Sequence, residues 1–150
     1  MMNFNAAETF FVKNENETAA LAEKLASTLK GGELIVFDGD LGAGKTFFTG
    51  ALCESLGVDR KKIASPTFVI MKKYSGKFDI YHWDFYRVSS VDELYIADFP
   101  EYLKAADSIT IVEWADMFRE CWENYRPAVK IEIRFGNGES EREITIRRID

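Results

Sequence analysis

The sequence predicts an α/β fold, in which a mixed sheet with a parallel core and added antiparallel hairpin strands is flanked by helices. One observation is an apolar run at residues 33–37 that enters a glycine-rich loop and then a helix-like segment. Another is a pair of hairpin patterns that turn at residues 75–77 and 136–138. Hairpins give antiparallel pairs, so parallel strands are expected to form only part of the sheet. The length suits one domain, 1–150.

In chain order, the first two elements are a strand at residues 8–12 and a helix that begins at a capping Asn14 or Asn16. Gly31 and Gly32 are expected to end this helix, one of them in the left-handed C-cap conformation. The buried face of the helix is predicted by leucines that recur every four residues, at positions 21, 25 and 29.

The next elements follow from apolar runs and turn residues. The strand at 33–37 leads through the loop into a helix at about 45–56, which Gly57 stops. Aromatic and β-branched residues then predict a hairpin of two strands, at 68–74 and 78–86.

In the C-terminal part, residues 90–93 form a capping-box pattern at a helix start. An apolar strand at 108–113 ends in a carboxylate, and a helix is expected from Asp116 to Tyr125 because Pro127 follows it. The last elements are the strands of the second hairpin, 129–135 and 142–149.

The loop after the strand at 33–37 is the strongest functional signal. Its sequence, Gly39-Asp40-Leu41-Gly42-Ala43-Gly44-Lys45-Thr46, fits the G-x-x-x-x-G-K-[ST] pattern of the phosphate-binding loop in ATP and GTP enzymes. Glycines let successive N–H groups point at a phosphate, and the helix N-terminus adds positive potential. Lys45 is expected to reach the β- and γ-phosphates, and the Thr46 hydroxyl to bind Mg²⁺.

A nucleotide hydrolase also needs a second protein ligand for Mg²⁺ and a group that positions the attacking water. Glu113 closes the apolar strand at 108–113, where a metal-linked carboxylate is expected. Asp84 lies in a strand where it would hold a metal-bound water or orient the nucleophile. Both carboxylates are therefore candidates for catalysis and for the metal.

Alternation in His82-Trp83-Asp84-Phe85-Tyr86-Arg87 places His82 and Tyr86 on the same face as Asp84, and the two bulky aromatic residues on the other. His82 is interpreted as a hydrogen-bonded structural residue, and Trp114 as packing. Ser65-Pro66-Thr67 is either a strand-entry turn or a switch-like loop that offers a hydroxyl to the γ-phosphate or Mg²⁺.

Composition excludes several classes of protein. A net charge of −6 argues against an extended nucleic-acid surface, which needs clustered Lys and Arg. No apolar run approaches the ~20 residues that span a bilayer, and the N-terminus does not resemble a signal peptide, so a cytoplasmic location without membrane contact is expected. With one histidine and two cysteines, Cys53 and Cys121, that share no ligand spacing, a zinc site is not expected, and both thiols are expected to be buried.

Four segments together resemble the TsaE (YjeE) family, the small bacterial ATPases of tRNA threonylcarbamoyladenosine (t6A) synthesis. They are the phosphate loop at 39–46, Ser65-Pro66-Thr67-Phe68, the segment at 82–87 and Val112-Glu113-Trp114. The resemblance covers roughly residues 10 to 116. It implies a P-loop NTPase-like sheet, slow ATP hydrolysis with Mg²⁺, and the protein partners TsaB and TsaD, whose complex modifies adenosine 37 of tRNA. Contact with tRNA would then be indirect.

The resemblance also assigns residues. Lys45 and Thr46 match the family's phosphate and Mg²⁺ residues, Glu113 its acidic metal-linked position, Asp84 the acid of its H-x-D-x-Y-R segment, and Thr67 its switch-like threonine. The expected nucleotide-binding residues are Gly39, Leu41, Gly42, Ala43, Gly44, Lys45, Thr46, Phe47, Thr67 and, by a weaker match, Arg142. Trp83 departs from the pattern, because an aliphatic residue is expected before Asp84.

Two alternatives remain open. The loop also fits compact small-molecule kinases, although the basic residues are scattered and form no arginine-rich lid. A non-catalytic module that ATP holds in shape for a partner is the second alternative. A GTPase is disfavoured because the sequence has no N-K-x-D segment to bind guanine.

Overall fold

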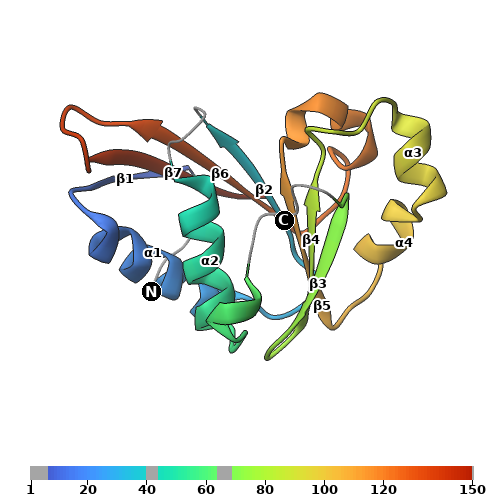
Figure 1. Ribbon diagram of the computed structural model, residues 1–150, viewed down its shortest axis with the longest axis horizontal. Coiled ribbons are helices and arrows are strands. Elements are labelled where there is room, and N and C mark those ends of the chain that lie inside the picture. The colour runs from blue at the N-terminus through green and yellow to red at the C-terminus, as the bar shows by residue number, and fades with distance from the viewer. Residues whose placement is uncertain (1–6, 40–43, 64–68, 150) are drawn as a thin grey trace.

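The computed structural model describes residues 7–39, 44–63 and 69–149, and within them the chain forms a seven-stranded mixed sheet (Figure 1). The hydrogen-bonded strand order is β1-β7-β6-β2-β5-β4-β3. β2 is parallel to β5 and β6, and β4 is parallel to β5, whereas β1, β3 and β7 pair antiparallel. The mixed sheet predicted from sequence is confirmed. The strands are β1 Glu8–Val12, β2 Leu34–Gly39, β3 Met71–Ser75, β4 Asp79–Asp84, β5 Ser108–Glu113, β6 Ala128–Phe135 and β7 Arg142–Ile149.

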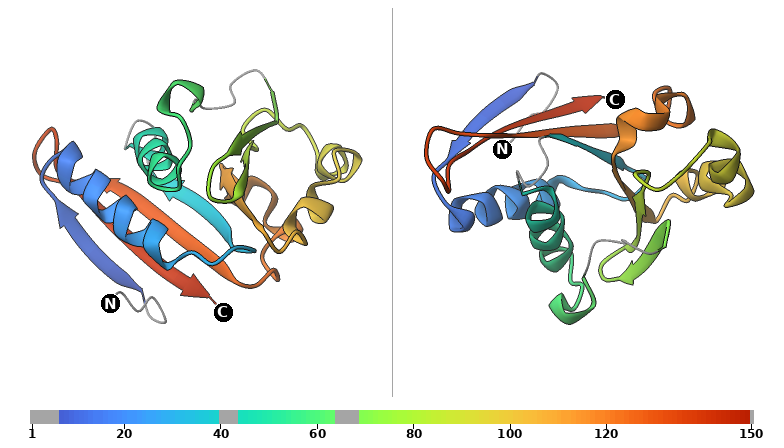
Figure 2. Two further views of the ribbon diagram at one scale, coloured as in Figure 1. Left: turned by 90° about the horizontal axis from the view of Figure 1, so that it is seen from below. Right: turned by 45° about the horizontal axis from the view of Figure 1, so that its top comes forward.

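Helices cover both faces of the sheet (Figure 2). α1 and α2 pack on one face, where Ile35 and Phe37 of β2 enter a shared core with them. α3, α4 and the 3₁₀ segment η2 contribute to a second core with Leu34 and Val36. Alternation along β2 therefore divides its side chains between two cores. The helices are α1 Glu15–Thr28, α2 Lys45–Ser55, α3 Val91–Ile96 and α4 Phe99–Leu103, and the 3₁₀ segments are η1 Arg60–Lys62 and η2 Ala115–Cys121.

The end of α1 differs from the expectation. The helix ends at Thr28, and its C-cap Leu29 is extended rather than left-handed. Gly31 and Gly32 do have positive φ, at 101° and 87°, but they form the turn that follows. The carboxylate of Glu33 accepts hydrogen bonds from the backbone N–H of Lys30 and Gly31 at 2.8 and 2.7 Å, which holds this turn. The glycines therefore serve the turn and not a helix cap.

The helix expected at residues 116–125 is wrong. The segment forms η2, which is interrupted at Phe118, where φ is −139° and ψ is 61°. The indole N–H of Trp122 donates to the Ala115 carbonyl at 2.8 Å and closes the segment on itself. The capping box predicted at α3 is not formed, because the Ser90 side chain makes no cap bond and Glu93 accepts from the N–H of Ser89, at 3.2 Å, instead of from that of the N-cap Ser90.

Candidate nucleotide-binding site

The carboxyl ends of three neighbouring parallel strands bring the candidate residues together. β2 ends at Gly39, β4 at Asp84 and β5 at Glu113. The register pairs Glu113 with Asp84 on one side and with Phe37 of β2 on the other. Ligands of open α/β sheets bind outside this edge. The two carboxylates that the sequence analysis chose separately are therefore direct neighbours at the edge from which the loop departs.

Lys45, the first residue of α2, is a buried cation, with 8% of its surface exposed. Its Nζ lies 3.3 Å from the Gly39 carbonyl oxygen and 4.2 Å from the centroid of the Trp114 ring. In the described part of the chain no carboxylate forms an ion pair with it, and the Asp84 carboxyl interacts with its charge only at longer range. Burying a charge is costly unless an opposite charge compensates it, and a carbonyl and an aromatic face compensate weakly. An anion would supply the missing partner.

The N-terminus of α2 faces the same place without a capping side chain. Gly44 is the N-cap, with φ at 110°, and no side-chain cap bond is made. A Cβ on Gly44 would meet nothing within 4 Å, so glycine is needed here for its backbone conformation and not for space. The first N–H groups of a helix lack internal partners and are a ready anion site. Residues 40–43 of the loop, with the expected Leu41, Gly42 and Ala43, lie outside the described residues.

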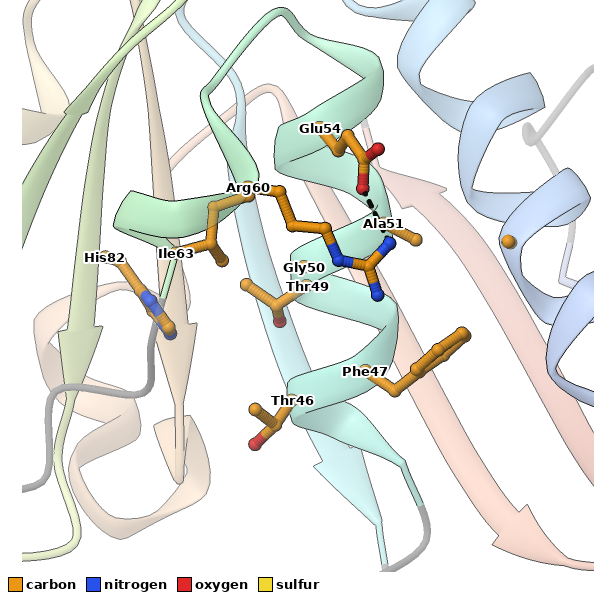
Figure 3. A pocket seen from close by; sticks show the side chains of 10 residues that line it. Thr46, Phe47, Thr49, Gly50, Ala51, Glu54, Arg60, Ile63 and His82 are labelled. Atoms are coloured by element: carbon orange, nitrogen blue, oxygen red, sulfur yellow. Dashed lines mark hydrogen bonds and ion pairs between the residues drawn. The ribbon is translucent and has the colours of Figure 1, made fainter.

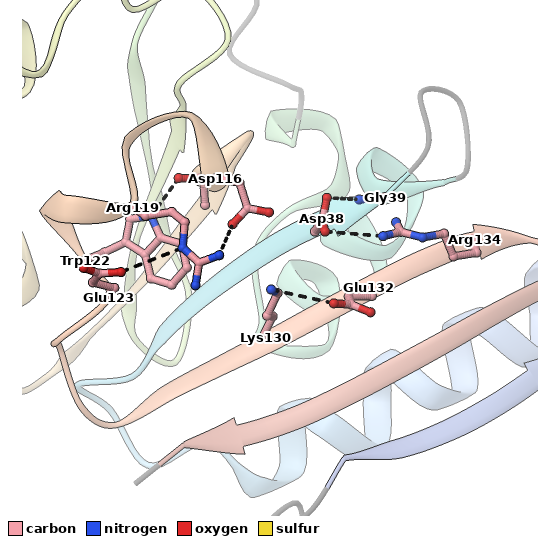
Figure 4. Close-up of polar contacts among 10 residues, drawn as sticks. Asp38, Gly39, Asp116, Arg119, Trp122, Glu123, Lys130, Glu132 and Arg134 are labelled. Carbon is pink, nitrogen blue, oxygen red and sulfur yellow. Dashed lines mark hydrogen bonds and ion pairs between the residues drawn. The ribbon is translucent and has the colours of Figure 1, made fainter.

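The start of the loop is braced from β6 (Figure 4). Asp38 accepts from the N–H of Gly39 at 2.8 Å and from the Arg134 guanidinium at 3.4 Å. A side chain at Gly39 would collide with the Ile133 carbonyl. Gly39 is thus held against β6 with its own carbonyl toward Lys45.

Asp84 and Glu113 occupy different surroundings. Burial raises the pKa of the Asp84 carboxyl above its usual value, and the neighbouring Glu113 raises it further. The N–H of Tyr86, which donates to Asp84 at 2.9 Å, opposes that rise, as do His82 and Lys45. Glu113 is more deeply buried, at 4% exposed, and its Oε2 lies 2.7 Å from His82 Nε2. A carboxyl with a raised pKa is suited to accept a proton.

Two hollows lie against α2: the first extends along the helix from Thr46 to Glu54, and the second lies at its N-terminus. In the first, Thr46 lies on α2 and His82 faces it from β4, with Thr49 on the next turn of the helix (Figure 3). The second is lined by Gly44, Phe47 and Arg142 together with Glu15 and Thr18 of α1. The expected residues Thr46, Phe47 and Arg142 therefore border hollows that flank the loop, whereas Thr67 lies outside the described residues.

Two contacts were missed by sequence reasoning. His82 is buried and hydrogen-bonded as expected, but its partner is the candidate metal residue Glu113. The alternation that placed His82 on the face of Asp84 was the available signal. Trp114, taken as packing, lies with its ring over Lys45 and 4.9 Å from the Tyr86 ring, in a left-handed backbone conformation with φ at 58°. Its place directly after Glu113, in one of the four segments that carry the family resemblance, was the available signal.

The residues present fit Mg²⁺ as part of a phosphate complex. Among the described residues there is no cluster of three or more His, Cys, Asp or Glu side chains that could form a metal cage. Mg²⁺ bound with nucleotides takes one or two carboxylates, and phosphate oxygens and waters complete its shell. Glu113, Asp84 and the Thr46 hydroxyl are oxygen donors of this kind, and the two carboxylates are paired in register.

Comparison with known proteins agrees with this geometry. The family model described as "Threonylcarbamoyl adenosine biosynthesis protein TsaE" matches residues 12–144. The TsaE protein of Bacillus subtilis is 38% identical over 137 residues, which are 91% of this chain and 82% of the relative. That of Synechocystis is 40% identical over 120 residues, 77% and 74% of the two chains. The crystal structure of Bacillus subtilis YdiB superposes with a TM-score of 0.74 at 32% identity, covering 97% of this chain and 87% of that one.

Other relatives are longer. The match spans 63% of the Rickettsia felis TsaE protein and 61% of that from Rickettsia conorii. Among the described residues, no helix has the length and apolar character to cross a membrane. The family match covers the phosphate loop, both carboxylate strands, β6 and the first residues of β7. This chain belongs to the TsaE family of tRNA threonylcarbamoyladenosine biosynthesis.

Proposed function

We propose that this chain is a P-loop ATPase that binds ATP with Mg²⁺, hydrolyses it slowly, and supports the TsaB–TsaD complex in forming t6A at position 37 of tRNA. The observation that carries the proposal is the buried ammonium of Lys45 at the uncapped N-terminus of α2, which contacts a carbonyl and an aromatic ring and forms no ion pair with a carboxylate of the described residues. Triphosphate is the anion that the loop motif at this position binds.

The roles of the residues follow from their positions. The Lys45 ammonium binds the terminal phosphates, and the N–H groups of the loop and of the first turn of α2 surround the rest. Phe47 and Arg142, which border the hollow beside α1, contact the nucleoside side of the ligand. The Lys45 ammonium now contacts the Gly39 carbonyl and the Trp114 ring. When phosphate replaces them, its positive charge is fully compensated.

Thr46 and Glu113 would hold Mg²⁺, with Asp84 at its water shell. When bound, Mg²⁺ neutralises charge on the β- and γ-phosphates. Asp84 accepts a hydrogen bond from the attacking water and orients it, and the raised pKa of its carboxyl favours taking up the proton. The Tyr86 N–H holds the acceptor in place at 2.9 Å.

Binding and chemistry are separable by mutation. Lys45→Ala should weaken ADP and ATP binding by at least about tenfold, because it removes the charge that contacts phosphate. Asp84→Ala and Glu113→Ala should retain nucleotide binding while hydrolysis falls about 100-fold. Fluorescent-ADP titration and phosphate release measure the two steps. Asp79→Ala, at the opposite end of β4, is the matched control and should leave both unchanged.

The same measurements distinguish the proposed ATPase from the nucleotide-gated module and the small-molecule kinase. Wild-type turnover in both carboxylate variants would favour the nucleotide-gated module, in which hydrolysis is incidental. Transfer of the γ-phosphate to an added metabolite would favour the kinase.

The partner assignment has its own test. ATP turnover measured with and without purified TsaB–TsaD should rise several-fold in the presence of the complex. The net charge of −6 supports protein partners rather than direct tRNA contact. Equal turnover with and without TsaB–TsaD, at concentrations that saturate any binding, would remove the partner from the proposal.

A further inference from the structure

A buried chain of hydrogen bonds runs across three strands behind the candidate site. Tyr74 lies on β3, His82 on β4 and Glu113 on β5. The Tyr74 hydroxyl lies 3.3 Å from His82 Nδ1, and His82 Nε2 lies 2.7 Å from Glu113 Oε2. His82 is 1% exposed and Tyr74 is 3% exposed, so water does not compete for these bonds.

We propose that His82 is a positioning residue that holds the carboxylate of Glu113 in the orientation required for Mg²⁺, and that Tyr74 fixes the ring of His82. This inference rests on the proposed function, since it assigns Glu113 to the metal. It adds a role to a histidine that the sequence analysis treated as structural.

The chemistry of the three groups determines the direction of the bonds. An ionised carboxylate accepts hydrogen bonds and donates none, so the proton between Glu113 and His82 belongs to Nε2. In the neutral imidazole the other nitrogen is then an acceptor, and the Tyr74 hydroxyl donates to Nδ1. Each member therefore fixes the orientation of the next, from β3 to the end of β5.

The position of the chain connects it to the site rather than to the core alone. Glu113 pairs in register with both Asp84 and Phe37, so it lies between β4 and β2, the strand from which the loop departs. His82 points toward α2 and lines the same hollow as Thr46 (Figure 3). The His82 ring thus contacts Glu113 and lines a hollow with Thr46, and both of these are expected metal residues. Outer partners that orient a ligating carboxylate commonly change metal affinity or activity 10–100-fold when removed.

The first test uses three variants. His82→Ala should lower kcat about 10–100-fold and raise the Mg²⁺ concentration needed for ADP binding, while the KM for ATP changes less than about twofold. His82→Gln keeps an N–H donor near the position of Nε2 and should recover activity to within about fivefold of wild type. Tyr74→Phe removes the bond to Nδ1 but leaves the bond between His82 and Glu113, and should have the smallest effect.

A control variant for loss of stability is available on β4, the strand of His82. Ile80→Ala leaves a cavity at a fully buried position on the face of His82 but removes no contact to Glu113. It should lower the melting temperature and leave the Mg²⁺ dependence of ADP binding unchanged. An equal loss of Mg²⁺ dependence in Ile80→Ala and His82→Ala would overturn the positioning role.

The second test does not use hydrolysis. The chain has one histidine, so the imidazole ¹⁵N spectrum reports His82 alone. A single form with a proton held on Nε2 is expected in the wild type, and Tyr74→Phe should shift the Nδ1 signal. A proton on Nδ1, or a rapidly exchanging mixture of tautomers, would overturn the proposed bond directions.

Different results would overturn the proposed ATPase function and the positioning role of His82. A wild type without Mg²⁺-dependent nucleotide binding and turnover would remove the proposed function and this role with it. An active wild type with an equally active, folded His82→Ala would remove only the role of His82.

Discussion

At the scale of single residues, burial decides which thiol can react. Cys53 on α2 is fully buried, and burial raises the pKa of its thiol above the usual 9.0 to about 12. Cys121 at the end of η2 is only half-buried, so the expectation that both cysteines are buried holds for one of them. Because the thiolate is the reactive species, Cys53 should be inert in the folded protein.

We therefore expect one thiol per chain to react with Ellman's reagent at pH 8, and two after denaturation. Substituting Cys121→Ser should abolish the reaction of the folded protein, and Cys53→Ala should leave it unchanged. Two fast-reacting thiols in the folded wild type would contradict the burial of Cys53.

The same shift predicts a pH dependence of stability. The folded-state pKa of Cys53 lies above the unfolded value, so the unfolded chain loses this proton first as pH rises. The stabilisation is fully present below pH 9.0 and is lost as pH rises towards about 12. The free energy of unfolding should fall by up to about 1.4 kcal/mol per pH unit more in the wild type than in Cys53→Ala. Parallel curves from urea unfolding at pH 8 to 11 would rule this out.

At the scale of elements, the start of α1 is set by one of the two asparagines that the sequence offered. Asn14 is the N-cap, and its Oδ1 accepts from the N–H of Glu17 at 2.9 Å. Glu17 in turn accepts from the N–H of Lys13 at 3.0 Å. Asn16 lies inside the first turn, where it caps nothing.

Asn14→Ala should accordingly cost about 1 kcal/mol of unfolding free energy, because a helix N–H loses its acceptor. Asn16→Ala is the matched control and should stay within about 0.5 kcal/mol of wild type, since alanine suits a helix interior. Chemical denaturation of both variants measures the difference. A larger loss of unfolding free energy in Asn16→Ala than in Asn14→Ala would show that Asn16 is the N-cap.

Elements also mark where sequence patterns failed. The segment after β5 has the composition of a helix, but the Phe118 ring packs near Phe85 at 6.1 Å and Trp122 bonds back to Ala115. The first contact reaches another part of the fold and the second closes the segment on itself. Together they outweigh a helical preference of a few tenths of a kcal/mol per residue. Local propensity could not have predicted them.

At the scale of the whole molecule, Glu33 joins distant parts of the chain. It is 2% exposed, accepts from Lys30 and Gly31 in the turn before β2, and pairs with Arg148 of the last strand at 3.5 Å. The buried carboxylate therefore ties the entry of the central strand to the C-terminal hairpin.

Glu33→Ala should cost about 3 kcal/mol of stability, because it leaves two N–H groups without their acceptor and removes the buried carboxylate that pairs with Arg148. Glu101→Ala removes an exposed carboxylate paired with Lys104 and should cost less than about 0.5 kcal/mol. Urea midpoints compare the two. Similar small losses in both would show that the Glu33 network does not stabilise the fold.

The sequence by itself determined the mixed α/β sheet and most of its elements. Apolar periodicity and turn residues are local signals, and β2, α2, β5 and both hairpins follow from them. It also predicts Lys45 and the two carboxylates as site residues, because the loop motif and a carboxylate at a strand end can be recognised without knowing the strand order.

Only the tertiary structure decided how these residues meet. His82 and Glu113 are 31 positions apart, and their bond exists because β4 and β5 are neighbours in register. The Trp114 ring over Lys45 likewise depends on β2 lying beside β5. Strand order results from the packing of the whole chain, so contacts across strands leave no trace in local sequence patterns.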